Sequence, residues 1–229
     1  MKKILKIEVD NITLEGELTL PENASGLVIF SHGSGSSRFS PRNNFVAQHL
    51  QRRELGTFLF DLLTKEEDEV YSMRFNIELL AQRLVSVTQW LMKLPGLQKL
   101  TIGYFGASTG AASAITAAAI LESKISAVVS RGGRPDLAKD QLYLVEAPTL
   151  FIVGEDDQVV LDLNRSALEK LAGPKKLEII KGATHLFEEP GTLEQVAQLS
   201  GDWFTKYLIR EPAPESRSTG SAPSKKKTP

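Results

Sequence analysis

Residues 103–114 read GYFGASTGAASA, and the five residues 106–110 within them match the pattern G-x-S-x-G. The pattern stands between a β-like run and an alanine-rich stretch typical of a helix. In that context it indicates a sharp strand-to-helix turn that presents the serine hydroxyl above the sheet edge. The flanking glycines let neighbouring backbone approach closely. The sequence therefore predicts Ser108 as a nucleophile, although a glycine-rich turn with an incidental serine would match equally well.

Eight β-like runs alternate with helical patterns on either side of this motif. The first two runs are amphipathic and predict an antiparallel hairpin, whereas the later ones are short, continuous and apolar, as strands buried on both faces should be. Such alternation is typical of an α/β fold with a mostly parallel sheet and helices on both faces. The runs occupy residues 3–10, 12–20, 26–33, 56–63, 99–108, 125–133, 149–157 and 176–185. The helical patterns occupy residues 41–55, 75–94, 108–123, 135–145, 161–172 and 191–208.

Composition indicates an ordinary globular protein. The chain has 229 residues, of which 41% are hydrophobic and 24% charged, which suits one large domain over residues 1–210. A net charge of −1 gives no sign of a nucleic-acid or membrane surface, and the absence of cysteine excludes disulfides and thiolate chemistry. We expect a cytoplasmic monomer or homodimer with a small-molecule substrate.

The end of the chain differs from the rest. Residues 211–229 contain no aromatic residue and no aliphatic residue larger than alanine. Such a segment cannot bury enough apolar surface to offset the entropy of ordering, so we predict a disordered tail.

A serine nucleophile needs a base, and the chain has three histidines. His49 lies in an amphipathic helical pattern, and His32 lies in the loop after the third β-like run. His185 follows the last β-like run and alone lies downstream of Ser108, which is the order this fold requires. We therefore predict His185 as the base.

The acid should follow the penultimate β-like run. Glu155, Asp156 and Asp157 stand together there, where a carboxylate could orient the imidazole. Spacing alone leaves Asp156 and Asp157 both open.

Acyl transfer also needs donors for the developing oxyanion. One should be the backbone amide of Thr109, directly after the nucleophile, and the other should come from the glycine-rich loop after the third β-like run. We place the second donor at Ser34, with Gly33 as its neighbour.

Taken in order, the stretches FSHGSGSS, GYFGASTGAA, IVGEDDQVV and GATHLFEEPG resemble the α/β-hydrolases, in particular the dienelactone hydrolase-like family. The resemblance covers about residues 1–208 and implies an α/β-hydrolase fold without a large lid domain. The family pattern G-x-x-D-x-x-V, matched by Gly154, Asp157 and Val160, implies Asp157 as the acid. Dienelactone hydrolases proper use a cysteine nucleophile, so the serine here implies ester, lactone or thioester hydrolysis without naming a dienelactone substrate.

Other functional classes fit less well. The pattern Gly33-x-Gly35 hints at a dinucleotide loop, but position 38 holds arginine where a third glycine is needed. The scattered histidines lack metal-ligand spacing, so we expect neither a metal nor a cofactor. A hydrolase-fold protein that binds a ligand or partner without catalysis is the remaining alternative.

Arg131 follows a central β-like run at the same sheet edge as Ser108. Its guanidinium could bind a substrate carboxylate in a bidentate pair, or it could pair with a local acid such as Asp61 or Asp156 and brace the cleft. The sequence leaves both interpretations open.

Overall fold

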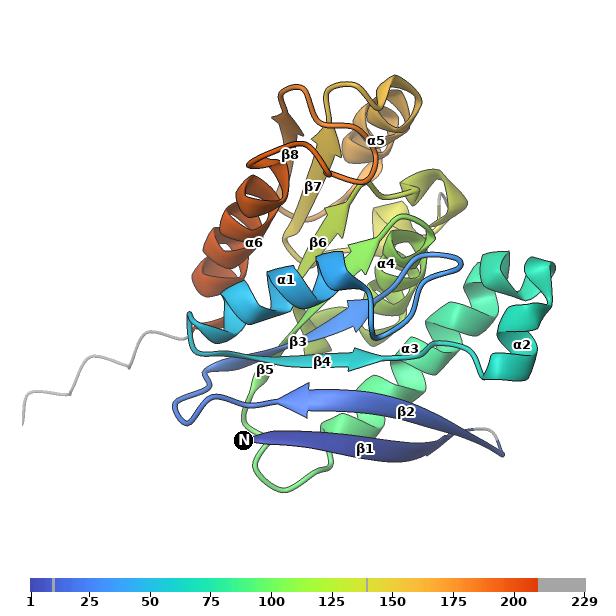
Figure 1. The fold of residues 1–229 in the computed structure, drawn as a ribbon, viewed down its shortest axis with the longest axis vertical. Coiled ribbons are helices and arrows are strands. Elements are labelled where there is room, and N and C mark those ends of the chain that lie inside the picture. The colour runs from blue at the N-terminus through green and yellow to red at the C-terminus, as the bar shows by residue number, and fades with distance from the viewer. Residues whose placement is uncertain (10, 139, 210–229) are drawn as a thin grey trace, which may run out of the picture.

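The computed structural model describes residues 1–9, 11–138 and 140–209, so the predicted tail at 211–229 lies outside the described residues. Within them, eight strands form one sheet in the order β1-β2-β4-β3-β5-β6-β7-β8 (Figure 1). The strands are β1 (Lys2–Val9), β2 (Ile12–Thr19), β3 (Gly26–Ser31), β4 (Leu55–Phe60), β5 (Thr101–Ala107), β6 (Ile125–Arg131), β7 (Thr149–Gly154) and β8 (Lys175–Ile180). β2 pairs antiparallel with β1 and β4, and all other pairings are parallel. The predicted fold class is confirmed.

The burial of the strands follows their hydrophobic patterns. Every residue of β3, β4 and β7 is buried, as expected for strands covered on both faces. In β1 the second half alternates between buried and exposed residues, which suits a hairpin strand at the sheet edge. Most of the continuous runs therefore lie inside the sheet. The run at 176–185 is an exception, because it forms the edge strand β8, in which only Ile180 is buried.

Helices cover the two faces of the sheet (Figure 1). One face carries α1 and α6, and the other carries α3, α4 and α5; each face encloses its own apolar cluster. The α-helices are α1 (Pro41–Gln51), α2 (Lys65–Glu69), α3 (Ile77–Leu91), α4 (Thr109–Leu121), α5 (Gln158–Lys170) and α6 (Thr192–Leu208). The 3₁₀ helices are η1 (Tyr71–Phe75), η2 (Glu122–Lys124), η3 (Pro135–Ala138) and η4 (Leu142–Leu144).

The helix expected over residues 135–145 is wrong. The structure has the short helices η3 and η4 there instead. Neighbouring segments hold both ends of this stretch: the Arg134 N–H donates to the Ser108 carbonyl at 3.1 Å, and the Val145 carbonyl accepts from the Gly173 N–H at 3.0 Å. Contacts with other segments therefore fix both ends of this stretch, and these contacts are not visible in its local pattern.

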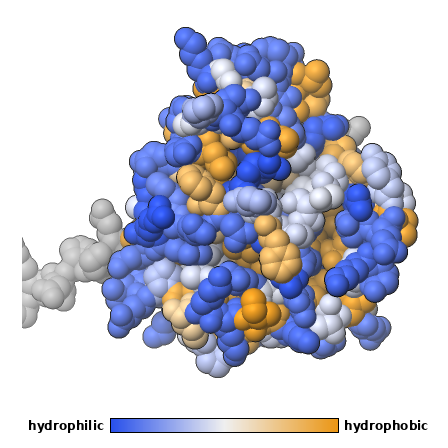
Figure 2. Space-filling view, viewed as in Figure 1, coloured by the Kyte–Doolittle hydropathy of each residue, from blue (hydrophilic) through white to orange (hydrophobic). Residues whose placement is uncertain are grey.

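The surface seen in Figure 2 is mostly hydrophilic, with apolar groups between the polar ones. Over residues 1–9, 11–138 and 140–209, none of the helices has both the length and the apolarity that crossing a bilayer requires.

Candidate active site

Ser108 lies in the turn between β5 and α4, as the motif predicted. Its φ of 51° and ψ of −123° are unusual for a residue with a side chain. Such strain persists only where the surroundings fix the backbone. Here the Ser108 N–H donates to the Arg131 carbonyl at 3.2 Å, and the Ser108 carbonyl accepts from the N–H groups of Ala111 and Arg134 at 3.1 Å each. The end of β6 and the first turn of α4 therefore hold the serine in place.

The two glycines of the motif allow close contact between segments. A Cβ at Gly106 would lie 2.5 Å from Ala111 Cα, and one at Gly110 would overlap the carbonyl oxygens of Ser31 and His32. Neither glycine needs a positive φ. The motif thus lets α4 begin directly against β3 and β5, which brings the loop after β3 next to Ser108.

His185 lies between the predicted nucleophile and the predicted acid. Its Nδ1 donates to Asp157 Oδ2 at 2.6 Å, and its Nε2 lies 3.3 Å from Ser108 Oγ. A carboxylate only accepts hydrogen bonds, so the Asp157 contact places the proton of a neutral imidazole on Nδ1. The free lone pair of Nε2 then faces the serine hydroxyl.

The structure separates the neighbouring acids that spacing left open. Asp157 precedes α5 without capping it through its side chain, so its carboxylate is free to meet His185. The Asp156 side chain is exposed, and its backbone N–H donates to the Ala183 carbonyl at 3.0 Å. Glu155 accepts from the Gly182 N–H at 3.0 Å, which ties this turn to the segment that carries His185. The geometry therefore places Asp157 beside the imidazole.

The predicted oxyanion donors lie close to Ser108, but one of them is occupied. A Cβ at Gly33 would stand 3.1 Å from Ser108 Cβ, so this loop touches the serine. The Ser34 N–H, however, donates to Thr109 Oγ1 at 2.8 Å. The Thr109 N–H lies in the first turn of α4, where amides have no acceptor within the helix.

His32 has a supporting position. The ring is buried, its Nδ1 donates to the Gly33 carbonyl at 3.0 Å, and its Nε2 accepts from the Leu62 N–H at 3.1 Å. Burial lowers the pKa of His32, so the ring stays neutral. His32 therefore links the loops that follow β3 and β4 and holds Gly33 in place.

Arg131 does not pair with either acid that the sequence suggested. Asp61 binds Arg38, and the Arg131 side chain is buried against Asn43 and Phe187. Only 5% of Arg131 is exposed. Very little of its guanidinium can reach a substrate in this conformation.

One contact at the site had no separate signal in the sequence. Gly132 has a φ of 52°, and a Cβ there would lie 3.4 Å from His185 Nδ1. The loop after β6 therefore packs directly against the imidazole. In the sequence, the adjacent Gly132 and Gly133 indicate a tight turn but not this contact.

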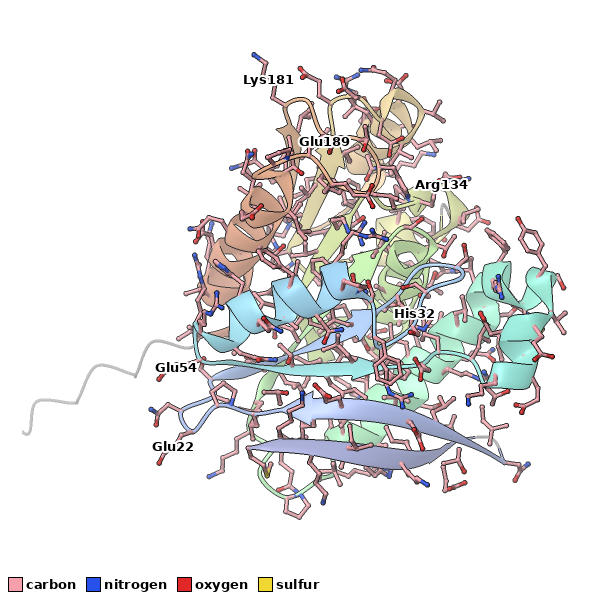
Figure 3. The ribbon with its side chains drawn as sticks, in the orientation of Figure 1. Glu22, His32, Glu54, Arg134, Lys181 and Glu189 are labelled. Carbon is pink, nitrogen blue, oxygen red and sulfur yellow. The ribbon has the colours of Figure 1, made fainter. Side chains whose placement is uncertain are left out.

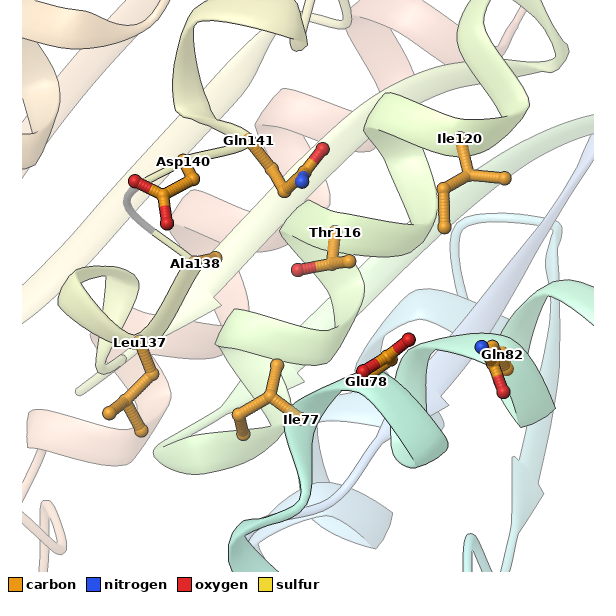
Figure 4. Close-up of a pocket in the computed structure, with 9 residues that line it drawn as sticks. All are labelled: Ile77, Glu78, Gln82, Thr116, Ile120, Leu137, Ala138, Asp140 and Gln141. Atoms are coloured by element: carbon orange, nitrogen blue, oxygen red, sulfur yellow. The ribbon is translucent and has the colours of Figure 1, made fainter.

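Two of the cavities in the structure are formed without the three side chains of this site. One of about 560 Å³ lies between the loops after β3 and β4, where His32 lines it (labelled in Figure 3). Another, of about 340 Å³, lies between α3, α4 and the segment around η3 (Figure 4). Ser108, Asp157 and His185 line neither cavity, and all three are partly exposed. They are thus reached from an open surface.

A solved structure of a dienelactone hydrolase from Anabaena variabilis ATCC 29413 resembles this chain over its whole fold. The TM-score is 0.88 and the identity 52%, over 91% of this chain and 98% of that one. Est1E from Butyrivibrio proteoclasticus has a TM-score of 0.77 at 17% identity, over 89% of this chain and 98% of its own, and so shows the shared fold alone.

Curated relatives from two strains of Mycobacterium tuberculosis are 56% identical over 197 residues, 86% of this chain. Each bears the name "Putative phosphoribosyl transferase", and the match covers 44% of its length. The chain therefore spans less than half of these relatives. No family model matches it.

Proposed function

The chain belongs to the dienelactone hydrolase-like family of α/β-hydrolases, and from this premise we propose that it is a serine hydrolase of small carboxylic esters, lactones or thioesters. The observation that carries the proposal is the pair of contacts made by His185. Its Nδ1 meets Asp157 at 2.6 Å and its Nε2 meets Ser108 at 3.3 Å. A nucleophile, a base and an orienting acid in this order are the components of acyl transfer.

The reaction would proceed through an acyl-enzyme. Ser108 Oγ attacks the substrate carbonyl carbon while His185 Nε2 takes the hydroxyl proton. The imidazolium, stabilised by Asp157, then gives that proton to the leaving alcohol or thiol as its bond to the carbonyl carbon breaks. In the second half of the reaction, His185 Nε2 takes a proton from a water molecule, whose oxygen attacks the carbonyl carbon of the ester on Ser108. The imidazolium then gives that proton to Ser108 Oγ as its bond to the carbonyl carbon breaks, which releases the acid and restores the serine hydroxyl.

Two backbone amides would stabilise the oxyanion. The Thr109 N–H is one donor, because it points from the first turn of a helix directly after the nucleophile. The Ser34 N–H becomes the second when the Thr109 hydroxyl, 2.8 Å away, releases it. Loss of such a donor typically costs about 3 kcal/mol of transition-state stabilisation.

The surroundings of Ser108 favour small or accessible acyl groups. β6 ends at Arg131 and β7 begins at Thr149, and the segment between them carries only η3 and η4 among its described residues. No large lid is built there. Ser108 and His185 are partly exposed, so the proposed substrates would reach them without a large rearrangement of the surrounding loops.

The transferase name of the mycobacterial relatives is not extended to this chain. These relatives are more than twice as long as the segment they share with it. More than half of each relative therefore has no counterpart in this chain, and the hydrolase proposal concerns the shared segment alone.

Covalent labelling tests the proposal directly. A fluorophosphonate probe should label the chain, and Ser108→Ala should abolish the labelling without loss of fold. A panel of p-nitrophenyl esters, thioesters and lactones would then rank the substrate classes. A chain that is neither labelled nor turns over any of these compounds would instead be a ligand- or partner-binding member of the family.

A further inference from the structure

Arg131 is a buried cation with an unusual set of neighbours. It ends β6 and is 5% exposed, yet no ion pair forms at its guanidinium within the described residues. Its contacts are Asn43 Oδ1, to which Nη2 donates at 3.4 Å, and the ring of Phe187, whose centroid lies 5.7 Å from Cζ. A weak hydrogen bond to a neutral amide and a ring face do not replace the hydration of a guanidinium.

Stability alone does not account for this burial. Burial, with a smaller effect from Arg42, lowers the pKa of Arg131 to about 10, which leaves the group protonated at neutral pH. An apolar side chain of similar volume often stabilises such a position better than an ion does. A role in the site would account for a cation at this position.

Phe187 connects Arg131 to the histidine. It lies two residues beyond His185, its ring is fully buried, and its φ of 55° lies in the left-handed region that a residue with a side chain rarely adopts. Surroundings that fix the residue must maintain such a conformation. The guanidinium of Arg131, which packs over the Phe187 ring, supplies part of those surroundings.

Hydrogen bonds between its two ends hold the segment that carries His185 in a compact loop. Both the N–H and the hydroxyl of Thr184 donate to the carboxylate of Glu189, at 3.1 Å and 2.6 Å (Glu189 is labelled in Figure 3). Residues 184–189 thus form one unit, whose orientation over the sheet depends on where it is attached. Phe187 attaches it to Arg131, and Glu188 attaches it to Arg42 of α1 at 3.1 Å.

We propose that Arg131 is a positioning residue of the hydrolase, and that Arg131, Asn43 and Phe187 form a latch that sets the place of His185 relative to Ser108 and Asp157. The inference rests on the proposed function. Its effect on catalysis follows from the 3.3 Å between His185 Nε2 and Ser108 Oγ, which is already long for a hydrogen bond. Misplacement of a reacting group by about 1 Å can cost about 100-fold in rate.

If the latch positions His185, breaking it should lower kcat with little change in KM. Arg131→Met keeps the apolar stem and removes the cation, and kcat should fall about 100-fold with KM within about twofold. Phe187→Leu should act in the same direction. Because both changes open the same latch, the double variant should lose little more than the worse single variant. Arg131→Lys, which keeps the charge but not the planar group, should recover part of the loss.

The assays would use p-nitrophenyl acetate and an ester of similar size that carries a free carboxylate. Arg165→Met, a change at an exposed arginine of α5, serves as the matched control and should leave both constants unchanged. Thermal melts confirm that each variant is folded at the assay temperature. The NMR signal of the His185 Nδ1 proton, held by Asp157, should broaden or vanish in Arg131→Met.

The other outcomes would contradict either the latch or the proposed hydrolase function on which it rests. A rise in KM for the carboxylate ester alone would make Arg131 a substrate-recognition residue. A lower melting temperature with unchanged kcat and an unchanged Nδ1 proton signal would make it a scaffold residue. If the parent protein is neither labelled by a fluorophosphonate nor active, the proposed function fails, and an unchanged Nδ1 proton signal in Arg131→Met would reject the latch separately.

Discussion

Replacing Asp157 by asparagine tests the proposed acid most directly. In the parent protein Asp157 Oδ2 accepts the Nδ1 proton of His185 at 2.6 Å, which leaves Nε2 free to accept a proton from Ser108. An asparagine amide can donate to Nδ1 instead, which moves the imidazole proton to Nε2 and removes the base. Asp157→Asn is therefore expected to lower kcat by about 10,000-fold, or about 5 kcal/mol of transition-state stabilisation.

The size of this effect can be bounded from the structure. The Asp157 side chain is 14% exposed, so its bond with His185 is shielded from water in a way that surface pairs are not. Loss of one charge-assisted hydrogen bond alone would cost about 1.5–3 kcal/mol, or about 10- to 150-fold. The wrong tautomer should add the rest, so a loss below about tenfold would refute the assignment.

Asp156→Asn is the matched control, because it makes the same chemical change one residue away on an exposed side chain. Changes at such surface positions usually stay within about 0.5 kcal/mol, so kcat should change by about twofold at most. Initial rates with p-nitrophenyl acetate, together with thermal melts of both variants, provide the comparison. Equal losses in the two variants, or a larger loss for Asp156→Asn, would place the acid elsewhere.

Three further changes have definite expected outcomes. Ser108→Ala should lower kcat by about a million-fold and leave the melting temperature unchanged; residual turnover near the parent rate would exclude Ser108 as nucleophile. Gly110→Ala should cost about 3 kcal/mol in urea unfolding, because its Cβ overlaps two carbonyl oxygens, whereas Gly96→Ala, in open space at a φ of 88°, should cost about 1 kcal/mol. The parent's free energy of unfolding should fall as the pH drops below 6.5, the ordinary pKa of His32, because burial lowers that pKa in the folded state and only the unfolded chain takes up the proton. His32→Gln should remove this part of the slope, which is at most about 1.4 kcal/mol per pH unit; identical slopes would contradict the neutral buried ring.

Much of the fold and the relative placement of the site residues could be predicted from chain order. Parallel strands bring their carboxyl ends to one edge, so a motif after β5 and a histidine after β8 lie at the same edge of the sheet. The segment after β8 must still extend past β7 and β6 to bring the histidine to the serine. The burial of most strands also followed from the sequence, because continuous apolar runs predict strands covered on both faces and alternating residues predict a strand with one exposed face. These predictions needed only the spacing of the apolar residues and the order of the elements along the chain.

Side-chain partners could not be predicted in the same way. Successive residues of a strand face opposite sides of the sheet, but the sequence does not say what covers each side at Arg131. Its partners Asn43 and Phe187 come from segments 88 and 56 residues away along the chain, as their numbers show. The short helices η3 and η4 escaped prediction for a related reason, because hydrogen bonds to distant residues fix the ends of that stretch.

If Ser34 is an oxyanion donor as proposed, its contact with Thr109 has a consequence for the timing of catalysis. In the resting protein the Ser34 N–H donates to the neutral Thr109 hydroxyl at 2.8 Å. An uncharged substrate carbonyl accepts a hydrogen bond no better than that hydroxyl, whereas a full negative charge accepts a far stronger one. On the proposed mechanism, the exchange of partners is therefore favoured only after charge has moved onto the substrate oxygen. On that mechanism the Thr109 hydroxyl would compete with the substrate oxygen and weaken ground-state binding more than transition-state binding, a difference that would raise kcat.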